Sequence, residues 1–334
     1  MDDRTDLTGC RPPGPPPLLS ETQMLQLAQQ GWLSLALPAR LAETLADLFT
    51  SSAVFFDQQD PAKARAYPSK SGTEFGYYRV EKEKEYITFR CRVHTAPSSP
   101  SPAPSQCTTV VPASLYGLED AAARAWQDCA LLLFRILCDL ARWSHLDPSS
   151  VWDDILDGTL TMPPAEDQMT YTLLRLFRYV PTTGVAETHT DLGLLTLCVG
   201  DRDGLEVLDR RQSTDDHPVW INAAGEARTA TILVGQTLRA LSNETFNAGG
   251  HRVVGHAAGR HSVVFALRHS SRHDVDFGLF GGQGRVRPSE LYRCIDVGKV
   301  NINTVKKRRD VQRAADEAGR LATETLRCNT VDRT

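Results

Sequence analysis

The 334-residue sequence predicts a mainly β fold with flanking helices. From Thr170 onward, short apolar runs with many β-branched residues alternate with Gly, Asp and Asn, a pattern typical of a β-sandwich or barrel. Before Thr170 the apolar residues recur mostly at helical spacing, and a helical composition returns after Ser289. Because no internal repeat divides the chain, we expect one β core inside a helical wrapper.

The first helices are predicted by their start signals. Residues 1–19 are rich in proline and are expected to be flexible. Ser20 and Gln23 have the spacing of a capping box, which begins a helix. A short buried strand is expected over residues 31–37, and Pro38 begins a second helix with leucines along one face.

A low-complexity segment then precedes the clearest helix of the chain. Residues 96–106 consist almost entirely of Ala, Pro and Ser, so we expect a mobile loop there. Apolar residues from Ala122 to Leu140 repeat at spacings of 4, 3, 4, 3 and 4, which predicts a helix facing the core.

These patterns indicate a single folded unit over residues 20–334. Within it we expect a helical N-terminal part at residues 20–165 and the β core at residues 166–270. Residues 271–334 would form a C-terminal lid or helical segment.

Composition and charge argue against several classes of protein. The formal net charge is −4, which gives no broad attraction to nucleic acid or anionic membranes, and no apolar run reaches the roughly 18 residues of a spanning helix. The basic run at residues 306–309 could mark a nucleic-acid site or a nuclear signal, but nearby acidic residues favour a solvated helix face. The eight cysteines are scattered and are expected to be reduced thiols. We therefore expect a cytoplasmic protein without nucleic-acid or membrane partners.

One pair of residues suggests a metal site. His189 and Asp191 stand two residues apart, so that on a strand both point to the same side. Alone, the pair could also be a turn aspartate beside a partly buried histidine. His251 begins another apolar strand 60 residues later and is the candidate third ligand. Two imidazoles and one carboxylate with open positions suit Fe(II) in oxygenases, whereas zinc usually has a more closed ligand set.

A second pair suggests a site for an anion. Arg260 and Ser262 lie on one face of the strand that continues through Leu267. A guanidinium binds a carboxylate through two hydrogen bonds, and a hydroxyl can add a third. The pair could therefore hold a dicarboxylate, unless Arg260 simply ends a solvent-exposed turn after Gly259.

These residues and their neighbours resemble the Fe(II)/2-oxoglutarate-dependent dioxygenases of the isopenicillin N synthase-like family. The resemblance covers about 100 residues and implies a distorted double-stranded β-helix, or jelly roll, flanked by helices. The matching segments keep the family's order and spacing, and they are residues 174–179, 189–196, 204–208, 241–243, 251–254 and 260–262.

The resemblance also implies roles for single residues. Chemistry would be centred on the metal, with Fe(II) as cofactor, 2-oxoglutarate and O2 as co-substrates, and no separate nucleophile. The implied iron ligands are His189, Asp191 and His251. The residues implied to bind the distal carboxylate of 2-oxoglutarate are Arg260, Ser262 and Tyr179.

Three departures from the family pattern concern the rim of the pocket. Phe177 stands where plant members often have Asn, and Gly235-Gln236 replaces the frequent Gly-Asp. The segment 180–188 is short beside many relatives. These differences suggest a substrate unlike a plant flavonoid or hormone.

The substrate pocket itself is predicted from few signals. Arg90 and Arg92 lie in a charged segment that approaches the pocket mouth in the family, where an arginine could bind an amino acid or another carboxylic acid. A solvated strand with alternating charge would explain the same residues. Phe177 is a further candidate, as is Phe280, which could instead pack in an exposed loop.

The implied activity is oxidation of an unactivated C–H of a small molecule, with decarboxylation of 2-oxoglutarate to succinate. Hydroxylation, desaturation and ring formation all remain open, and specialised metabolism is the expected setting. One alternative is an isopenicillin N synthase-type oxidase, which uses iron and O2 without 2-oxoglutarate and also carries Arg-x-Ser. Another is a non-catalytic binding module, although idle buried His and Asp ligands are costly to hold in place. The sequence leaves the identity of the substrate and the oligomeric state open.

Overall fold

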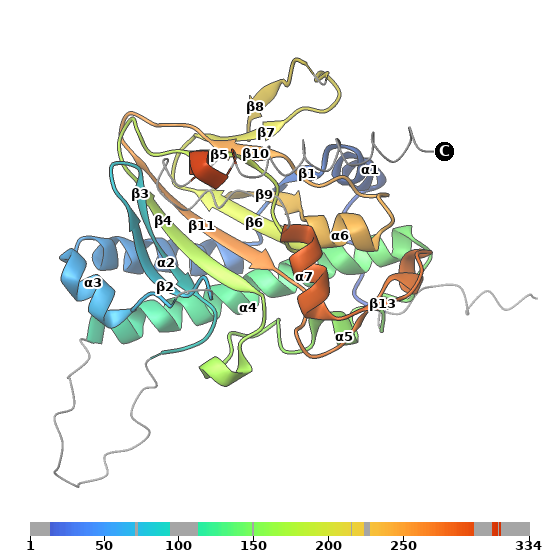
Figure 1. The fold of residues 1–334 in the computed structure, drawn as a ribbon, viewed down its shortest axis with the longest axis horizontal. Helices are drawn as coiled ribbons and strands as arrows, with labels where there is room; N and C mark the ends of the chain where they lie inside the picture. Colours follow the sequence, from blue (N-terminus) through green and yellow to red (C-terminus); the bar gives the residue numbers. More distant parts are fainter. Residues whose placement is uncertain are drawn as a thin grey trace, which may run out of the picture.

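Two antiparallel sheets face each other across the centre of the molecule, and helices cover the outer side of the larger sheet (Figure 1). This computed structural model describes residues 14–70, 73–93, 113–148, 150–214, 216–223, 228–296, 309–312 and 314. The predicted mobile loop at residues 96–106 and most of the Pro-rich N-terminus lie outside these ranges. The predicted mainly β fold with a jelly-roll core and flanking helices is confirmed, and neither sheet is closed.

The large sheet contains seven strands and joins distant parts of the chain. Every neighbouring pair in it is antiparallel. In spatial order its strands are β1 (Trp32–Ala36), β9 (Thr229–Val234), β6 (Leu195–Gly200), β11 (Arg260–Leu267), β4 (Leu173–Tyr179), β3 (Lys84–Phe89) and β2 (Gly76–Val80).

The small sheet carries the segments that the sequence associates with metal binding. Its strands are β5 (Ala186–His189), β10 (His251–Val253), β7 (Leu205–Leu208) and β8 (Trp220–Asn222). Apolar side chains of both sheets, such as Val207 and Phe177, meet in one buried cluster between them. A further two-stranded ribbon contains β12 (Val275–Asp276) and β13 (Arg285–Val286).

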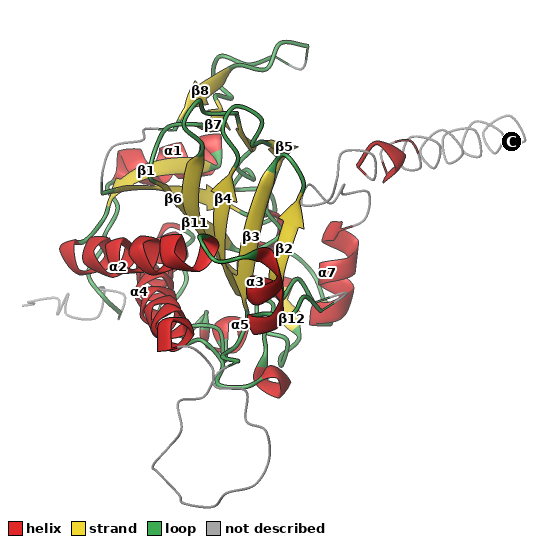
Figure 2. Cartoon of the chain, turned by 90° about the vertical axis from the view of Figure 1, so that its left-hand side faces the viewer, coloured by secondary structure: helices red, strands yellow, loops and turns green. Residues whose placement is uncertain are grey.

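Helices α1 (Glu21–Gln30), α2 (Ala39–Phe56) and α4 (Ala113–Trp143) form as predicted. Both hydrogen bonds of the capping box at Ser20 are present. The apolar stripe of α4 packs on the outer face of the large sheet, where Trp126 meets Phe265 with ring centroids 5.3 Å apart. Figure 2 shows α2 and α4 together on this side of the sheet.

The remaining helices are short. None of the helices in the described ranges combines the length and hydrophobicity that crossing a membrane requires. The short helices are α3 (Asp60–Ala66), α5 (Asp153–Leu156), α6 (Gln236–Leu241) and α7 (Pro288–Asp296), with 3-10 turns at Glu166–Gln168 and Phe277–Phe280.

The N-terminal part is less purely helical than predicted, because β1, β2 and β3 all join the large sheet. The charged segment that includes β3 is not a solvated strand, since every residue of β3 is buried. Its Glu85 is neutralised from outside the strand by Lys63, whose Nζ lies 2.5 Å from Oε2, and by Arg178. The alternating charges therefore pair with other elements instead of with water.

Candidate metal centre

The three predicted metal ligands come together at one point between the sheets. His189 ends β5 and His251 begins β10, and the two residues stand directly opposite each other in the small sheet. Asp191 follows β5 by two residues, with its Oδ1 at 3.8 Å from Nε2 of His189 and 3.9 Å from Nε2 of His251. One ligand atom from each residue lies within 4.8 Å of the other two.

Backbone carbonyls orient both imidazoles. The Nδ1 of His189 lies 2.7 Å from the carbonyl oxygen of Glu187, and the Nδ1 of His251 lies 3.0 Å from that of Gly249. In neutral imidazoles Nδ1–H therefore donates to the backbone, which leaves the lone pair on Nε2 for a metal. This is the tautomer that a metal site requires.

The carboxylate of Asp191 also fits a metal ligand. Its Oδ2 is buried and has no hydrogen-bond partner among the described groups. Burial opposes its charge, but the neighbouring His251 and His189 outweigh this effect and lower the pKa of Asp191 below its usual value. An ionised carboxylate with an unsatisfied oxygen and two oriented imidazoles is the donor set that Fe(II) takes in a facial triad.

Helix α6 braces the turn that contains Asp191. The backbone N–H of Gln236 donates to the carbonyl oxygen of Asp191 at 2.8 Å, and its Nε2 donates to Oγ1 of Thr190, also at 2.8 Å. Gly235 allows this close approach, because a Cβ there would lie 2.0 Å from the carbonyl oxygen of Gly193. The Gly235-Gln236 departure thus contacts the metal-binding turn, whereas the sequence placed it only at the pocket rim.

The predicted co-substrate residues line the inner face of the large sheet. Tyr179 of β4 stands between Lys84 of β3 and Arg260 of β11 in one row of paired residues. The guanidinium carbon of Arg260 and the Nζ of Lys84 each lie 5.9 Å from the Tyr179 ring centroid. The next row places Ser262 beside Phe177.

Arg260 is buried and not at a solvent-exposed turn, so the alternative reading of this residue is wrong. Only 4% of it is exposed, and its Nε donates to the carbonyl oxygen of Arg202 at 3.0 Å. No ion pair joins it to a carboxylate in the described part of the chain. Gly200 makes room for it, since a Cβ there would lie 2.2 Å from Nη2 of Arg260. A buried, unneutralised guanidinium calls for an anionic ligand.

The groups around Arg260 complete an anion site. Burial raises the pKa of Tyr179 to about 12, so its phenol stays neutral and can donate a hydrogen bond. The Oγ of Ser262 is buried and has no hydrogen-bond partner among the described groups. Both hydroxyls can therefore serve a ligand carboxylate beside the guanidinium.

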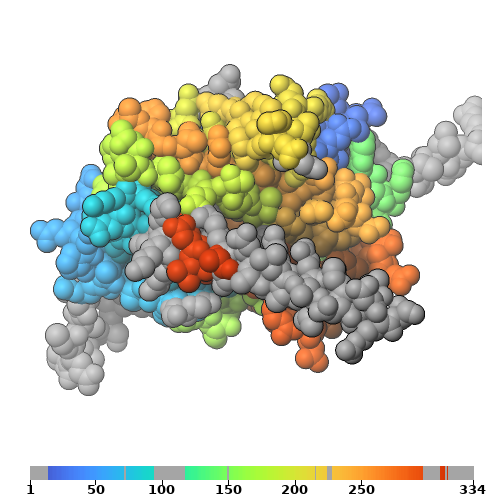
Figure 3. Space-filling view, turned by 45° about the horizontal axis from the view of Figure 1, so that its top comes forward, coloured from blue at the N-terminus to red at the C-terminus, as the bar shows by residue number. Residues whose placement is uncertain are grey.

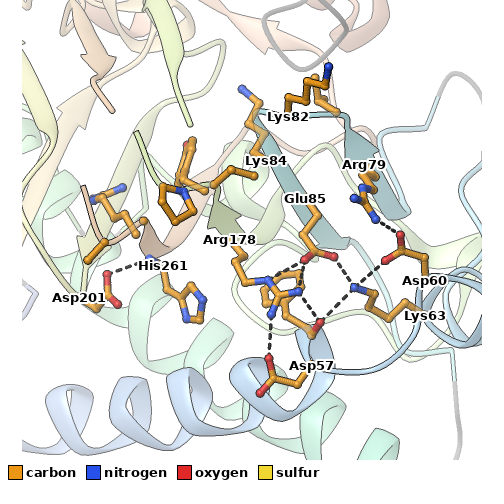
Figure 4. A pocket seen from close by; sticks show the side chains of 18 of the residues that line it. Asp57, Asp60, Lys63, Arg79, Lys82, Lys84, Glu85, Arg178, Asp201 and His261 are labelled. Carbon is orange, nitrogen blue, oxygen red and sulfur yellow. Dashed lines mark hydrogen bonds and ion pairs between the residues drawn. The ribbon is translucent and has the colours of Figure 1, made fainter. Parts of the chain in front are cut away.

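A cavity of about 700 Å³ lies beside these co-substrate residues (Figure 4). Its wall includes Tyr179 and Arg260, together with charged side chains from α3, β2, β3 and β4. Figure 4 shows Arg178 within this wall, where its Nη1 lies 2.8 Å from Oδ1 of Asp57. The cavity therefore approaches the co-substrate residues and not the triad.

The predicted substrate-pocket residues separate into two groups. Phe177 lies on the inner wall and stacks on Tyr179, with ring centroids 5.3 Å apart. Arg92 instead pairs with Asp120 of α4 at 2.8 Å, and Phe280 packs on Trp152 at 5.7 Å. Asp120 belongs to α4, and Phe280 packs against the apolar cluster that α4 forms on the outer face of the large sheet. These contacts place Arg92 and Phe280 away from the triad, contrary to the prediction.

Arg90 has a different setting from Arg92. Its Nη1 donates to the carbonyl oxygen of Thr73 at 2.5 Å, and its Nε donates to that of Thr170 at 3.2 Å. It lies near Arg268, an inner arginine that the sequence analysis missed together with Arg175. A signal was present, since Arg175 is a charged residue inside the apolar run of β4.

The family comparison covers the strands that form this site. Residues 161–269 match the model of the 2OG-Fe(II) oxygenase superfamily. A curated relative, "Oxidoreductase vrtI" of Penicillium aethiopicum, is 35% identical over 119 residues, which cover 34% of this chain. The matched part spans 26% of that relative, so the likeness concerns about a quarter of its length.

Solved structures share the fold at low sequence identity. A protein from Caulobacter crescentus assigned to the 2OG-Fe(II) oxygenase family has a TM-score of 0.64 and 20% identity, covering 81% of this chain and 91% of that one. A Neurospora crassa protein in complex with alpha-KG and 5-formyluracil has a TM-score of 0.62 and 19% identity, covering 82% and 88%. At these identities the structures establish a common jelly-roll fold.

The matched range contains the whole triad as well as Arg260 and Ser262. Fe(II), 2-oxoglutarate and O2 are the cofactor and co-substrates of this oxidoreductase superfamily, which agrees with the donor set found here. The resemblance to the isopenicillin N synthase-like class fits within it. The family match, the fold and the ligand set agree, and residues 161–269 carry a domain of the 2OG-Fe(II) oxygenase superfamily.

Proposed function

We propose that the protein is an Fe(II)- and 2-oxoglutarate-dependent oxygenase that oxidises an unactivated C–H of a small molecule. The observation that carries this proposal is the convergence of His189, Asp191 and His251, with both Nε2 atoms directed to one point. Hydroxylation, desaturation or ring formation would follow, and we place the reaction in specialised metabolism.

Metal binding and co-substrate binding fall to different side chains of the site. His189, Asp191 and His251 would hold Fe(II) on one side, which leaves positions for co-substrates. When bound, Fe(II) supplies the activation of O2, coupled to decarboxylation of 2-oxoglutarate to succinate.

The protein would orient the co-substrate and keep water away. Arg260, with Ser262 and Tyr179, would bind the distal carboxylate of 2-oxoglutarate through charge-assisted hydrogen bonds. The apolar cluster between the sheets, which includes Phe177 and Val207, would exclude water from the reacting groups.

Anaerobic titration tests this proposal. Fe(II) and then 2-oxoglutarate are added to the protein, and the visible charge-transfer band of the chelated co-substrate is sought. O2 is then admitted and succinate is measured. We expect a band and succinate in the wild type, and neither in His189→Ala or Asp191→Ala. Metal binding without band or succinate would contradict the proposal, and oxidation of a substrate without 2-oxoglutarate would favour the isopenicillin N synthase-type oxidase.

We also propose a cytoplasmic location and a small-molecule partner, without nucleic acid or membrane. The proposed location is supported by the cysteines within the described ranges, which are all free thiols, as expected in a reducing compartment. Fractionation of cells that express the tagged protein tests the location.

A further inference from the structure

Three arginines gather around one carboxylate on the inner side of the large sheet. Glu74 accepts an ion pair from Arg268, at 2.8 Å between Oε2 and Nη1, and from Arg175, at 3.1 Å between Oε1 and Nη2. Arg90 lies beside them, since its Nη1 donates at 2.5 Å to the carbonyl oxygen of Thr73, the residue before Glu74. We name these four residues the arginine cluster.

The arginine cluster has a surplus of positive charge. Three guanidiniums face one carboxylate, so two positive charges remain uncompensated inside it. Arg268 and Arg175 are only 8% and 9% exposed, and the Nε of Arg268 is buried without a hydrogen-bond partner among the described groups. Buried cations of this kind are stable when an anion completes their pairing.

The arginine cluster lies beside the proposed iron site. Arg268 directly follows β11, and its Cγ lies 3.0 Å from the place where a Cβ would stand on Gly193, two residues after Asp191. Asp191 cannot serve as the missing anion, because its carboxylate belongs to the metal-binding triad. An anion bound by Arg268 would therefore sit close to the reacting centre.

The arginine cluster calls for a ligand other than the 2-oxoglutarate proposed at Arg260. Arg260 begins β11 and Arg268 follows its last residue, so the two are eight residues apart, or roughly 26 Å at about 3.3 Å per residue. One molecule of 2-oxoglutarate, a five-carbon acid, is far too short to reach both. If Arg260 binds the co-substrate, the arginine cluster is available to a different acid.

Aromatic rings beside the arginine cluster indicate the rest of that ligand. The guanidinium of Arg175 lies 5.2 Å from the Tyr86 ring centroid and 5.9 Å from that of Phe177. Tyr78 stacks on Tyr86 at 5.1 Å and extends this surface. Flat apolar walls next to cations suit a carboxylate attached to an apolar skeleton.

We propose that the arginine cluster binds the carboxylate of the primary substrate, which is therefore a small organic acid with an apolar skeleton. This inference rests on the proposed oxygenase function and names the substrate class for it. It assigns Arg268 and Arg175, and not Arg92, as the residues that select the acid, while Arg90 adds positive charge.

Matched acids and amides test the inference. The protein is loaded with Fe(II) and saturating 2-oxoglutarate without O2, and phenylacetate, octanoate and their neutral amides are titrated by calorimetry. We expect at least one acid to bind about tenfold or more tightly than its amide, as charge-assisted hydrogen bonds predict. Arg268→Gln should remove this preference, whereas Arg40→Gln, at an arginine whose side chain is 80% exposed, should keep it.

If Arg268→Gln folds poorly, a second variant still tests whether the arginine cluster binds an acid. Glu74→Gln leaves the arginines without their shared carboxylate, so we expect the acid to bind several-fold more tightly. A purely structural ion pair would give lower thermal stability and no gain in affinity. Failure of both acids to bind, or equal binding of acid and amide, would overturn the inference.

The same titrations separate this inference from the proposed function. Loss of the Fe(II)–2-oxoglutarate band in the wild type would refute the proposed function. A normal band in both wild type and Arg268→Gln, with unchanged acid affinity in the variant, would refute the inference alone.

Discussion

Arg260 depends on a residue that has no side chain. Gly200 lies opposite Ser262 in the sheet, and the space where its Cβ would stand is filled by the guanidinium of Arg260. The co-substrate site is thus built from one cation and the space that a glycine leaves for it. Pairing of β6 with β11 sets this arrangement, which a sequence motif of Arg-x-Ser does not reveal.

Gly200→Ala should therefore imitate the loss of Arg260. Because the new methyl group would lie 2.2 Å from Nη2, the guanidinium must move, and we expect the 2-oxoglutarate concentration for half-maximal succinate formation to rise about tenfold or more. Arg260→Ala should give the same phenotype. The matched control is Gly117→Ala in α4, where no atom lies within 4 Å of the added Cβ and a gain of about 0.5–1 kcal/mol in stability is expected. An unchanged requirement in Gly200→Ala would refute this account.

The residues of the metal centre were predictable from their spacing at strand ends, since His189 is the last residue of β5 and Asp191 lies in the turn that follows. His189 and Asp191 are two apart, and His251 begins a second apolar strand. The arginine cluster was not predictable in this way. Glu74 and Arg268 are 194 residues apart, and only the pairing of distant strands brings them together.

The buried side chain of Lys84 makes the stability of the protein depend on pH. It is 1% exposed, and burial lowers its pKa to about 7. Between pH 7 and about 10.4 the unfolded chain binds a proton that the folded protein lacks, so stability should rise with pH through this window. Below pH 7 the folded protein must bury the charge, at a cost on the order of a few kcal/mol.

Lys84→Met tests this dependence. We expect the variant to be more stable than the wild type at pH 6 and to lose most of that advantage by pH 9.5, as measured by urea unfolding. Lys82→Met changes an exposed neighbour and should show no such trend. A gain that is equal at both pH values would contradict the assignment.

At the scale of elements, α6 acts as a clamp on the metal-binding turn. Its first residue, Gln236, binds both the backbone of Asp191 and the side chain of Thr190. The clamp exists because Gly235 lets the end of β9 approach Gly193 closely. Sequence reasoning identified the unusual Gly-Gln pair but not its contact, since β9 and the turn lie about 45 residues apart.

Gln236→Ala should loosen this clamp without removing a ligand. We expect Fe(II) affinity to fall by roughly 10–100-fold, the range typical of groups that orient metal ligands, with the fold unchanged by circular dichroism. Arg239→Ala in the same helix removes only a surface ion pair with Glu244 and should bind Fe(II) normally. Equal metal affinity in both variants would show that α6 does not position the turn.

Sequence patterns predicted helices and strands well where local signals within the element specify it. The capped helix α1 and the apolar stripe of α4 formed as expected, because local hydrogen bonds and periodic burial specify them. The burial of strand β3 was missed because its charged residues resemble a solvent-exposed segment. Its burial depends on partners such as Lys63 and Arg178, which lie in other elements.

At the scale of the whole molecule, the C-terminal segment is tied to the core near the metal centre. Arg309 is 2% exposed and pairs with Glu83 of the turn between β2 and β3 and with Glu187 of β5, each at 3.0 Å. Figure 3 shows the described part of this segment lying beside the region of β2 and β3. The predicted solvated face at residues 306–309 is therefore wrong for Arg309, and residues 306–308 lie outside the described ranges.

Arg309→Ala should show that this attachment supports the site. Its loss leaves two partly buried carboxylates without their shared cation, and we expect stability to fall by about 1–3 kcal/mol in urea unfolding. Fe(II) affinity should fall as well, because the carbonyl oxygen of Glu187 orients His189. Arg285→Ala, which removes an ion pair of a largely exposed arginine, is the control and should change neither quantity measurably. If both variants behave alike, Arg309 does not couple the C-terminal segment to the metal centre.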